Sequence, residues 1–551
     1  MPSLLPVSGT LGRKRAAHLL RRVAFGCNRE QIEAFANKSV MQAVEDLLTP
    51  NSLLAPHADA SNGVTWMPDG SIAAPETKII AWWMYHALDP SKPPTIFPRL
   101  SFFLHTCLTI KYDLVPRTHL YYYLRLLMEY TDKSYKTLVR KMTVDNGMGL
   151  FLNISDSTKD HPNENYAREL LELFTVGKGP QIGPGDYTNY TEGDILEAAR
   201  ILTGFITNWD YNDVSKYDPD LGWAVMFPYP PHHDPTNKSF SAAFGNRTIQ
   251  GRADKAGMLQ EVDDLIDMIF DQEAVSLFII RKLYRYFVHY EITAEIESDI
   301  ILPLAETFRN NGFHFMPVLS QLLNSSHFFD EDDAVVGDHV IGGLIKSPLD
   351  LWYSTVKGFG ANIPDPNVDL ASLQSWLHYY QIYSPEMGMI LFNPSSVAGY
   401  DPMYQEPEFN RYWINQSTLP SRYGLIYQWL LDHNMHSAPA AGRFNALYFA
   451  ENPAYIPPYY GFDPQGNPGP HDGARIADHL VRNIVDYLLP VELSQDRFMY
   501  FRDEVLLDSL SPVSWMMEWD NYKASGNPTN VQSQLTKLVK AVIQSPEFQL
   551  Y

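Results

Sequence analysis

Residues 161–179 read HPNENYARELLELFTVGKG, and this stretch shows the helical character of the chain most clearly. Its apolar residues recur at three- and four-residue spacing, which predicts an amphipathic α-helix. Pro162 disfavours helical geometry at the residue before it, so the helix is expected to begin no earlier. Gly177 suits the left-handed turn that follows many helices. The stretch therefore predicts a helix that ends just before Gly177.

The same spacing recurs through most of the first 330 residues and returns near the C-terminal end. It predicts helices over 15–25, 29–48, 78–88, 97–109, 120–129, 133–144, 191–205, 255–270, 273–290, 296–310, 315–324, 347–359, 474–488, 494–507 and 530–545. Pro303 is expected to kink or split one helix, and Thr191 and Pro348 mark the starts of two others. Strand-like alternation is scarce. We expect a mainly α fold: a large multi-helical globular protein with long Pro- and aromatic-rich loops and little β-structure.

No internal repeat divides the chain. We expect residues 1–551 to form one unit, with a helical core over 1–330 and a helix-and-loop lobe over 331–551 as a subdivision. Residues 206–252 interrupt the helical pattern with aromatic, proline and asparagine residues. A loop of this length in a compact protein is either functional or disordered, and its aromatic rings favour burial. We expect this loop to fold back over the helical body as a lid.

The charge balance excludes one broad class of function. The 551 residues contain 42 Lys and Arg against 64 Asp and Glu, a formal net charge of −22. A protein that grips the phosphates of nucleic acid needs a cationic surface, so nucleic-acid binding is not expected. The one basic segment is residues 12–22, GRKRAAHLLRR, whose arginines flank apolar residues. It predicts an amphipathic helix, for which a nucleic-acid or lipid contact is a minor alternative.

Cysteine content and apolar runs narrow the class further. Cys27 and Cys107 are the only cysteines, which excludes a disulfide framework and a Cys-rich zinc site but leaves their pairing open. No apolar run approaches the roughly 20 residues that span a bilayer, so no membrane span is expected. At the N-terminus, charges follow a short apolar segment, the reverse of a secretory signal. The chain is expected to be soluble and shows no export address.

The polar side chains of the 161–179 helix gather on one arc. They are Glu164, Asn165, Arg168, Glu169 and Glu172. In one interpretation, the arc is a solvated face held by i,i+4 ion pairs of Arg168 with Glu164 and Glu172. In the other, the three glutamates and Arg168 are catalytic acid–base groups or metal ligands. Asn163 and Asn165 are weak helix formers, which favours bonds from them to a neighbouring loop or a ligand.

Two histidines are further candidates. His233 and Asp234 lie in the 206–252 loop and could bind a divalent metal, with Glu169 as a third ligand, or form an acid–base pair. A plain turn is the alternative. Lys238 is a candidate binding residue, interpreted as the ion-pair partner of Asp234. His105 lies on an apolar helix, where a buried histidine bonded to a backbone carbonyl is the alternative to a binding role.

Standard catalytic motifs are absent. The chain has no HExxH, Glu-x-x-His, GxSxG, Walker A or Rossmann glycine motif, which disfavours the enzyme classes that depend on them. His433 and His436 stand one turn apart and could bind a metal only with ligands from elsewhere. Residues 457–473, PPYYGFDPQGNPGPHDG, could stack on a carbohydrate or peptide, with packing onto the core as the alternative. No cofactor is demonstrable, although the candidate residues would suit a divalent metal.

Seven stretches together resemble a known family. In order they are AAHLLRRVAFG (16–26), PNENYARELLELFTVG (162–177), YTEGDILEAARILTG (190–204), HDPTNKSFSAAFG (233–245), IKSPLDLW (345–352), LFNPSSVAGYD (391–401) and SPEFQ (545–549). Over essentially its whole length, the chain resembles the bacterial family catalogued as domain of unknown function 1800. Two positions depart from the family pattern: only His105 matches its Asn-His-Phe, and Tyr400 stands where the family has Trp after Gly399.

The resemblance implies a context rather than an activity, because the family name records that none is assigned. Members are commonly exported to the periplasm or cell surface and are often encoded beside proteins that resemble alkaline phosphatases and sulfatases. The resemblance thus implies a partner of that kind. Two functions stay open. The first is a binding or assembly component of a bacterial envelope or secretion-related system. The alternative is a metal- or carboxylate-dependent hydrolase that acts on an envelope or extracellular polymer.

Overall fold

Helices dominate the structure, as the sequence predicts. The computed structural model describes residues 2–50, 76–90, 92–211, 213–332, 340–361, 363–431 and 446–551. It is 57% helical and 6% strand, and the strands in these residues form only two-stranded antiparallel sheets. The prediction of a mainly α fold with little β-structure is confirmed.

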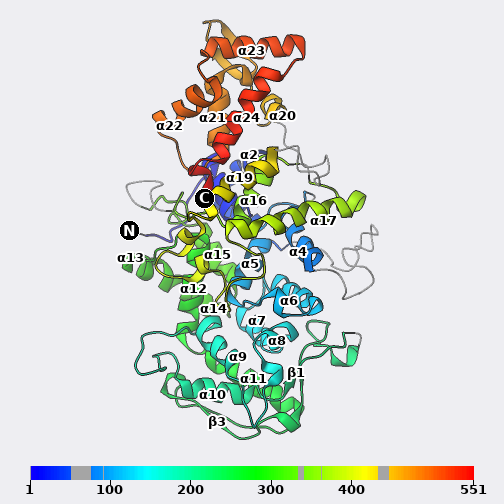
Figure 1. Ribbon diagram of the computed structural model, residues 1–551. Coiled ribbons are helices and arrows are strands. Elements are labelled where there is room, and N and C mark those ends of the chain that lie inside the picture. Colours follow the sequence, from blue (N-terminus) through cyan, green and yellow to red (C-terminus); the bar gives the residue numbers. More distant parts are fainter. Residues whose placement is uncertain are drawn as a thin grey trace.

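Figure 1 shows an elongated arrangement in which the middle of the chain forms one end and the C-terminal helices form the other. The first end contains α9 (Asn165–Glu169), α10 (Glu192–Ile201), α11 (Lys255–Phe270), β1 (Phe205–Ile206), β2 (Phe227–Pro228), β3 (Lys238–Ser239) and β4 (Thr248–Ile249). The opposite end contains α20 (Ala446–Glu451), α21 (Ala477–Leu488), α22 (Gln495–Met499), α23 (Pro512–Ser525), α24 (Thr529–Ile543), β5 (Tyr459–Phe462) and β6 (Pro468–His471).

The remaining helices make up the rest of the body. From the first half of the chain these are α1 (Gly12–Val23), α2 (Arg29–Ala36), α3 (Val40–Leu48), α4 (Glu76–Tyr85), α5 (Phe97–Cys107), α6 (Arg117–Glu129), α7 (Tyr135–Met142) and α8 (Asn146–Phe151). From the second half they are α12 (Glu273–Phe287), α13 (Ala294–Ile296), α14 (Leu302–Asn310), α15 (Phe315–Leu323), α16 (Pro348–Gly358), α17 (Pro366–Tyr383), α18 (Asp401–Tyr404) and α19 (Thr418–Leu431).

An aromatic core joins distant parts of the chain. The ring of Trp83 on α4 lies 6.4 Å from that of Phe25, 5.9 Å from Phe102 on α5 and 4.9 Å from Phe392. Such edge-on and tilted ring pairs add about 0.5–1.5 kcal/mol beyond their burial. The two cysteines are also buried and are free rather than bonded to each other.

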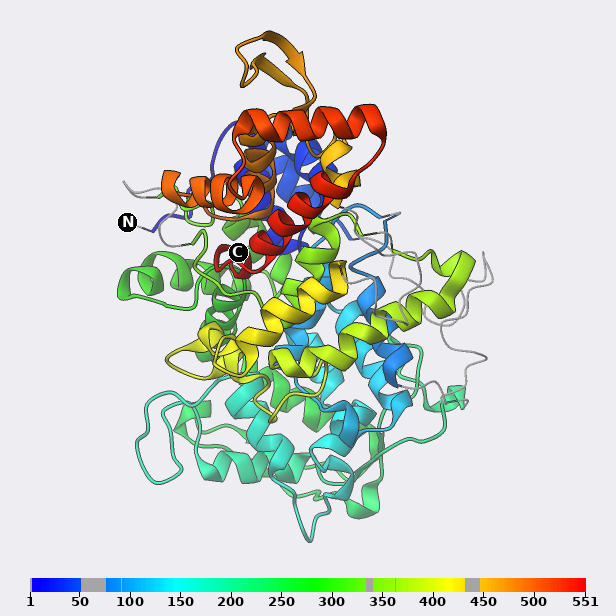
Figure 2. The ribbon, with the colours of Figure 1, turned by 45° about the horizontal axis from the view of Figure 1, so that its top comes forward.

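The basic segment 12–22 forms α1, but two of its arginines face the interior rather than solvent. Arg21 and Arg22 are 8% and 0% exposed. Arg21 donates hydrogen bonds to the carbonyls of Tyr487 and Leu489 at the end of α21, and Arg22 donates to the carbonyl of Val340. These bonds satisfy carbonyls that a helix end or turn leaves open. The first helix is therefore fixed to the C-terminal part of the chain, and Figure 2 shows the two side by side.

The described residues of 206–252 contain the sheets β1–β2 and β3–β4 together with buried aromatic rings. Trp223 and Tyr211 are 1% and 6% exposed, and the ring of Tyr211 stacks on Tyr122 of α6 at 4.5 Å. The segment lies against α10 and α11. Several of its rings are buried as predicted, although Trp209 and Tyr229 are 64% and 39% exposed.

Candidate functional site

The 161–179 stretch forms a helix of two kinds. α9 continues directly into the π-helix η4, Leu170–Phe174. The Oγ1 of Thr175 donates to the carbonyl of Leu170, and the N–H of Gly177 donates to the carbonyl of Leu171 at 3.0 Å. The predicted helix is present and ends before Gly177. Its regular α-helical geometry stops at Glu169, however, and the wider π-helical turn follows. Short π-segments within helices occur frequently at functional sites.

Side chains from other helices complete the bonding of the π-helix. Lys282 on α12 donates to the carbonyl of Leu173 at 2.8 Å, and Tyr135 on α7 donates to the carbonyl of Phe174 at 2.9 Å. The apolar side of the helix is fully buried, since Tyr166, Ala167, Leu170, Leu171 and Phe174 are each at most 1% exposed. Buried carbonyls need such partners, so the surrounding helices stabilise this turn.

The polar arc faces the chain that follows it, residues 178–192. Arg168 donates to both carboxylate oxygens of Glu192 at 2.7 Å and to Glu164 at 3.2 Å. Glu172 instead accepts from Lys178 at 2.7 Å and from the hydroxyl of Tyr190 at 3.0 Å. The expected pair of Arg168 with Glu164 forms. The expected pair with Glu172 does not, because Glu192 takes the arginine and the π-turn rotates the helix.

Glu169 is the exception on this arc. It is half-buried, and no described residue donates a hydrogen bond or an ion pair to its carboxylate. Burial, and then the neighbouring charge of Glu172, raise the pKa of Glu169 to about 7. A carboxyl group with such a pKa exchanges its proton near neutrality, which is the property of a general acid or base.

This pKa makes a prediction for stability. Because the folded-state pKa of Glu169 lies above the ordinary 4.5, folding favours its protonated form. The contribution of protonated Glu169 to the stability of the fold is complete below about pH 4.5 and is lost as the pH rises through 7. As the pH rises from 5 to 8, the free energy of unfolding of Glu169→Gln should therefore increase by about 1 kcal/mol relative to that of the wild type, after allowance for partial exposure. Melting temperatures of both proteins at the two pH values test this.

Glu164→Gln is the matched control for that experiment. Glu164 lies on the same arc but is ion-paired with Arg168 at 3.2 Å. Its substitution should give no relative gain at pH 8. Equal behaviour of the two variants would contradict a special position for Glu169.

The two asparagines of the motif bond to neighbouring loops. The backbone N–H of Asn163 donates to Ser157, and the side-chain oxygen of Asn163 accepts from the N–H of Asn165 at 3.0 Å. The side-chain amide of Asn165 donates to that of Asn153 at 3.1 Å. Both side chains therefore fix the entry to the helix.

His233 lies in a buried ionic cluster with Glu261 and Lys238. The Nε2 atom of His233 is 3.2 Å from one carboxylate oxygen of Glu261, and Lys238 donates to the other at 2.5 Å. All three side chains are at most 2% exposed. The interpretation of Lys238 as ion-pair partner of Asp234 is wrong: Lys238 bonds only the backbone carbonyl of Asp234. The carboxylate of Asp234 pairs instead with Arg200 on α10 at 2.8 Å.

His105 lies elsewhere, in the aromatic core. It is 0% exposed, and its Nδ1 atom is 2.9 Å from the hydroxyl of Tyr123, which donates to the carbonyl of Leu108. Burial lowers the pKa of His105 to about 3. The histidine is buried as expected, but its partner is a tyrosine rather than a backbone carbonyl.

The candidate residues thus form separate groups rather than one site. Glu169 adjoins Glu172 on η4, His233 is bonded to Glu261, and Asp234 is bonded to Arg200. In the part of the chain that the structure describes, no group of three or more His, Cys, Asp or Glu side chains could hold a metal ion. His433 and His436 lie outside the described residues.

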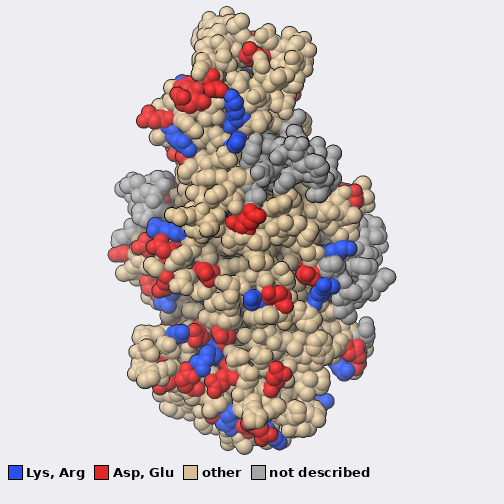
Figure 3. Space-filling view, in the orientation of Figure 1, with Lys and Arg blue, Asp and Glu red and all other residues tan. Residues whose placement is uncertain are grey.

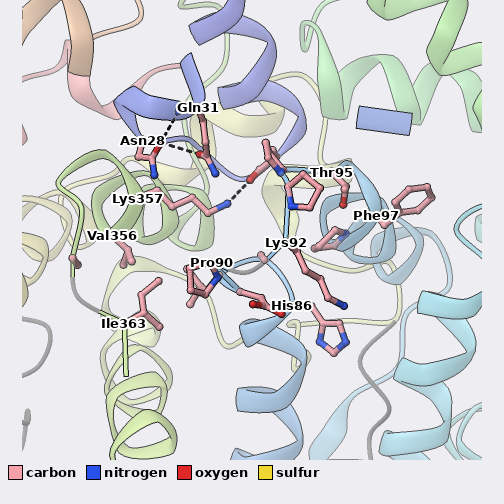
Figure 4. Close-up of a pocket in the computed structure, with 18 of the residues that line it drawn as sticks. Asn28, Gln31, His86, Pro90, Lys92, Thr95, Phe97, Val356, Lys357 and Ile363 are labelled. Atoms are coloured by element: carbon pink, nitrogen blue, oxygen red, sulfur yellow. Dashed lines mark hydrogen bonds between the residues drawn. The ribbon is translucent and has the colours of Figure 1, made fainter. Parts of the chain in front are cut away.

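A cavity with a volume of about 320 Å³ was not predicted from the sequence. Figure 4 shows it between the start of α2, residues 86–90 and 92–97, and the end of α16. Its walls are partly apolar, with Pro90, Phe97 and Val356. The run of prolines at 90, 93, 94 and 98 is the only sequence signal that marks it.

Hydrogen-bond donors face this cavity. Lys357 donates to the carbonyl of Ala24 at 2.7 Å, and burial lowers the pKa of Lys357 to about 8. The side chains of Asn28 and Gln31 cap α2 with their oxygens, and no described residue accepts from their NH₂ groups. The cavity therefore suits a ligand with an apolar body and oxygen acceptors.

The hairpin β5–β6 projects from the C-terminal end of the molecule (Figure 2). Its side chains alternate, so that Tyr460 and Phe462 share one face and are 77% and 68% exposed. Tyr459, on the other face, lies 5.4 Å from the ring of His479 on α21. The hairpin thus packs one face on the body and presents two aromatic rings to solvent.

Two further observations concern the distribution of surface charge and the character of the helices. On the face shown in Figure 3, and outside its grey residues, Lys and Arg side chains are interspersed with Asp and Glu rather than gathered in one patch. None of the helices in the described ranges has the length and apolar character needed to cross a membrane.

Comparison with known proteins identifies the family. A family model described as "Protein of unknown function (DUF1800)" matches residues 18–550. No curated protein and no solved structure matches the chain significantly. The family match confirms the resemblance carried by the seven sequence stretches and covers nearly every residue. The chain therefore belongs to the DUF1800 family of proteins of unknown function.

Proposed function

We propose that this protein is a binding or assembly component of a bacterial envelope or secretion-related system, and that the β5–β6 hairpin is its contact surface. The observation that carries the proposal is the pair of exposed rings, Tyr460 and Phe462, on one face of a projecting hairpin. Exposed aromatic side chains gathered in this way are typical of protein interfaces, where they bind at low entropic cost.

The turn of the hairpin supports this role because hydrogen bonds and an ion pair hold it firmly. Asp463 accepts hydrogen bonds from the backbone and side chain of Asn467 in the turn and pairs with Arg475 at 3.2 Å. Arg475 also binds Asp520 on α23 at 2.8 Å. A rigid presentation lowers the entropy lost when a partner binds.

The envelope context rests on the family resemblance, which also suggests the partner: a protein resembling alkaline phosphatases and sulfatases that is encoded nearby. We propose that the whole chain acts as one unit in this role. Contacts between distant segments support a single unit, such as that of Arg99 on α5 with the C-terminal Tyr551 at 2.9 Å. The cavity beside Lys357 would then hold a small ligand or a short segment of the partner.

Substitution of both rings tests the proposal. Tyr460→Ser/Phe462→Ser should weaken binding to the neighbouring phosphatase-like protein by about 30-fold or more in calorimetry, the effect of losing an interface hot spot. The melting temperature should stay the same, because both rings are exposed. Val368→Ser on α17, at a site that is 83% exposed, is the matched control and should bind normally. Failure of the wild-type protein to bind, or equal loss in the control, would refute the proposal.

A carboxylate-dependent hydrolase is the second candidate, and Glu169 is the observation that favours it. Its unpaired carboxylate with a pKa of about 7 lies beside Glu172 on a π-helix, with Arg168 and Lys178 nearby. Hydrolysis of envelope polymers by the wild type, lost in Glu169→Gln and retained in Glu164→Gln, would favour this function. Metal analysis of the purified protein tests the metal-dependent version of this function.

A further inference from the structure

A buried amide lacks every hydrogen bond it could make. Asn410 lies in the short helix η10 (Phe409–Trp413) and is 8% exposed. Neither its side-chain oxygen nor its side-chain nitrogen has a hydrogen-bond partner among the described residues. A buried polar group left in this state costs about 1–3 kcal/mol. Such groups in native proteins need an explanation, and a bound ligand is one.

Asn410 lines a second cavity, separate from the one beside Lys357. This cavity has a volume of about 40 Å³ and lies between α5, α12, α18 and η10. It has room for roughly three water molecules or one carboxylate group. Its walls include the rings of Tyr286, Phe409 and Trp413 beside the polar side chains of Lys282, Arg285 and Asn410.

The side chains that line this cavity carry more positive than negative charge. Arg99, also in the wall, is neutralised by its ion pair with Asp350. Lys282 and Arg285 form no ion pair with any described residue; Lys282 donates to the carbonyl of Leu173 and Arg285 to that of Tyr290. The two terminal nitrogens of Arg285 donate no hydrogen bond to a described residue. An anion is therefore the complementary ligand.

The backbone at Phe409 holds the guanidinium in place. Phe409 has a φ of 42°, which is uncommon for a bulky residue and is retained only where the surroundings impose it. This conformation puts its ring 4.5 Å from the guanidinium carbon of Arg285. A stacked guanidinium keeps its fork of N–H donors in one orientation, which suits bidentate recognition of a carboxylate.

We propose that this cavity binds a carboxylate that carries an adjacent N–H group, the chemistry shared by a free amino acid and the C-terminus of a peptide. Arg285 binds the carboxylate, with Lys282 adding positive charge. The NH₂ group of Asn410 donates to the same carboxylate, and its carbonyl oxygen accepts the ligand N–H. One ligand thus satisfies both atoms of the buried amide. The site does not depend on the hairpin and stands whether or not the proposed function holds.

Calorimetric titration of the full-length protein tests the site with four small probes. N-Acetylglycine supplies a carboxylate and an amide N–H, glycine supplies a carboxylate and an ammonium, acetate has the carboxylate alone and N-acetylglycinamide lacks it. We expect N-acetylglycine or glycine to bind at least about tenfold more tightly than acetate, and the amide not to bind. Preference for N-acetylglycine indicates a peptide C-terminus, and preference for glycine a free amino acid.

Variants locate the binding. Asn410→Leu should abolish it and raise the melting temperature of the free protein, because an apolar side chain of similar size replaces an unsatisfied amide. Arg285→Gln should weaken binding by at least about tenfold. Arg281→Gln, one turn earlier on α12 and paired with Glu297, is the control and should bind normally. No binding of any carboxylate, or unchanged binding in Asn410→Leu and Arg285→Gln, would overturn the proposal and leave the cavity to water.

Discussion

Asp350→Asn should lower the free energy of unfolding by about 3–5 kcal/mol, because it leaves a buried arginine without its counter-charge. Asp350 on α16 is 5% exposed and pairs with Arg99 on α5, which is 1% exposed. Three rings, those of Phe25, Tyr286 and Tyr551, enclose the guanidinium at 5.0–5.1 Å. Both side chains are almost fully buried, so bulk water screens the remaining charge only weakly and the arginine keeps most of its desolvation cost.

Urea denaturation of the variant and the wild type measures this effect. Asparagine keeps the volume of Asp350 and an oxygen for its cap with Ser347, so the comparison isolates the charge. Glu331→Gln is the control, because it breaks a pair with Arg15 at 2.6 Å whose side chains are 26% and 29% exposed and thus reached by solvent. Exposed pairs contribute less than about 1 kcal/mol. Similar shifts for both variants would show that burial does not govern the strength of the Arg99–Asp350 pair.

Local sequence signals predicted many helices, although α17, α19 and α23 lie outside every predicted range and the helix expected over 29–48 is two, α2 and α3. The capping box of Thr191 with Asp194 and the position of Pro348 in the first turn of α16 are both present. Pro303 lies in the first turn of α14, and the helix expected over 296–310 is one unbroken helical run with a π-helical turn at Glu297–Ile301. Such signals involve residues no more than four positions apart, so they can be read directly from the sequence.

Long-range partners could not be predicted in the same way. Lys238 was assigned to Asp234 because the two are four residues apart, whereas its partner Glu261 is 23 residues away on α11. In the sequence, Arg21 and Arg22 look like solvent-facing residues. The backbone carbonyls to which they donate hydrogen bonds come from distant parts of the chain and are near them only in the folded protein. The spacing of apolar residues also did not reveal the π-turn at Leu170–Phe174, because a stretch of five residues fits an α-helix and a π-helix equally well. The hydrogen bonds that favour the π-turn come from Lys282 and Tyr135 on other helices.

The cavities could not be predicted either, because residues far apart in the sequence line them. Asn410 shows no sequence signal, since an asparagine among aromatic residues is ordinary in a loop. Its orphaned amide becomes visible only when α5, α12 and η10 are assembled around it. The polar arc of the 161–179 helix was easier to find, yet its partner Glu192 and the isolation of Glu169 needed the fold.

Glu261→Gln should also lower the free energy of unfolding by about 3–5 kcal/mol, and most of the damage should fall on residues 229–252. The carboxylate of Glu261 is 0% exposed, accepts from Lys238 and from the backbone N–H of Arg252 at 2.6 Å, and lies 3.2 Å from the Nε2 atom of His233. A glutamine turns one of these acceptors into a donor and leaves the ammonium of Lys238 uncompensated. Hydrogen exchange should show faster opening of this segment than of α12.

A second substitution shows whether charge or shape causes the loss. Adding Lys238→Met to Glu261→Gln removes the uncompensated ammonium, so the double variant should recover part of the stability that the single variant loses. Asp264→Asn, one turn further along α11 and in a half-exposed pair with Arg252 at 2.8 Å, should cost less than about 1 kcal/mol. If the double variant were less stable than Glu261→Gln, the hydrogen bonds of the lysine to Asp234 and Glu261 would matter more than its charge. The cluster would then act mainly as a geometric anchor for the loop that carries His233.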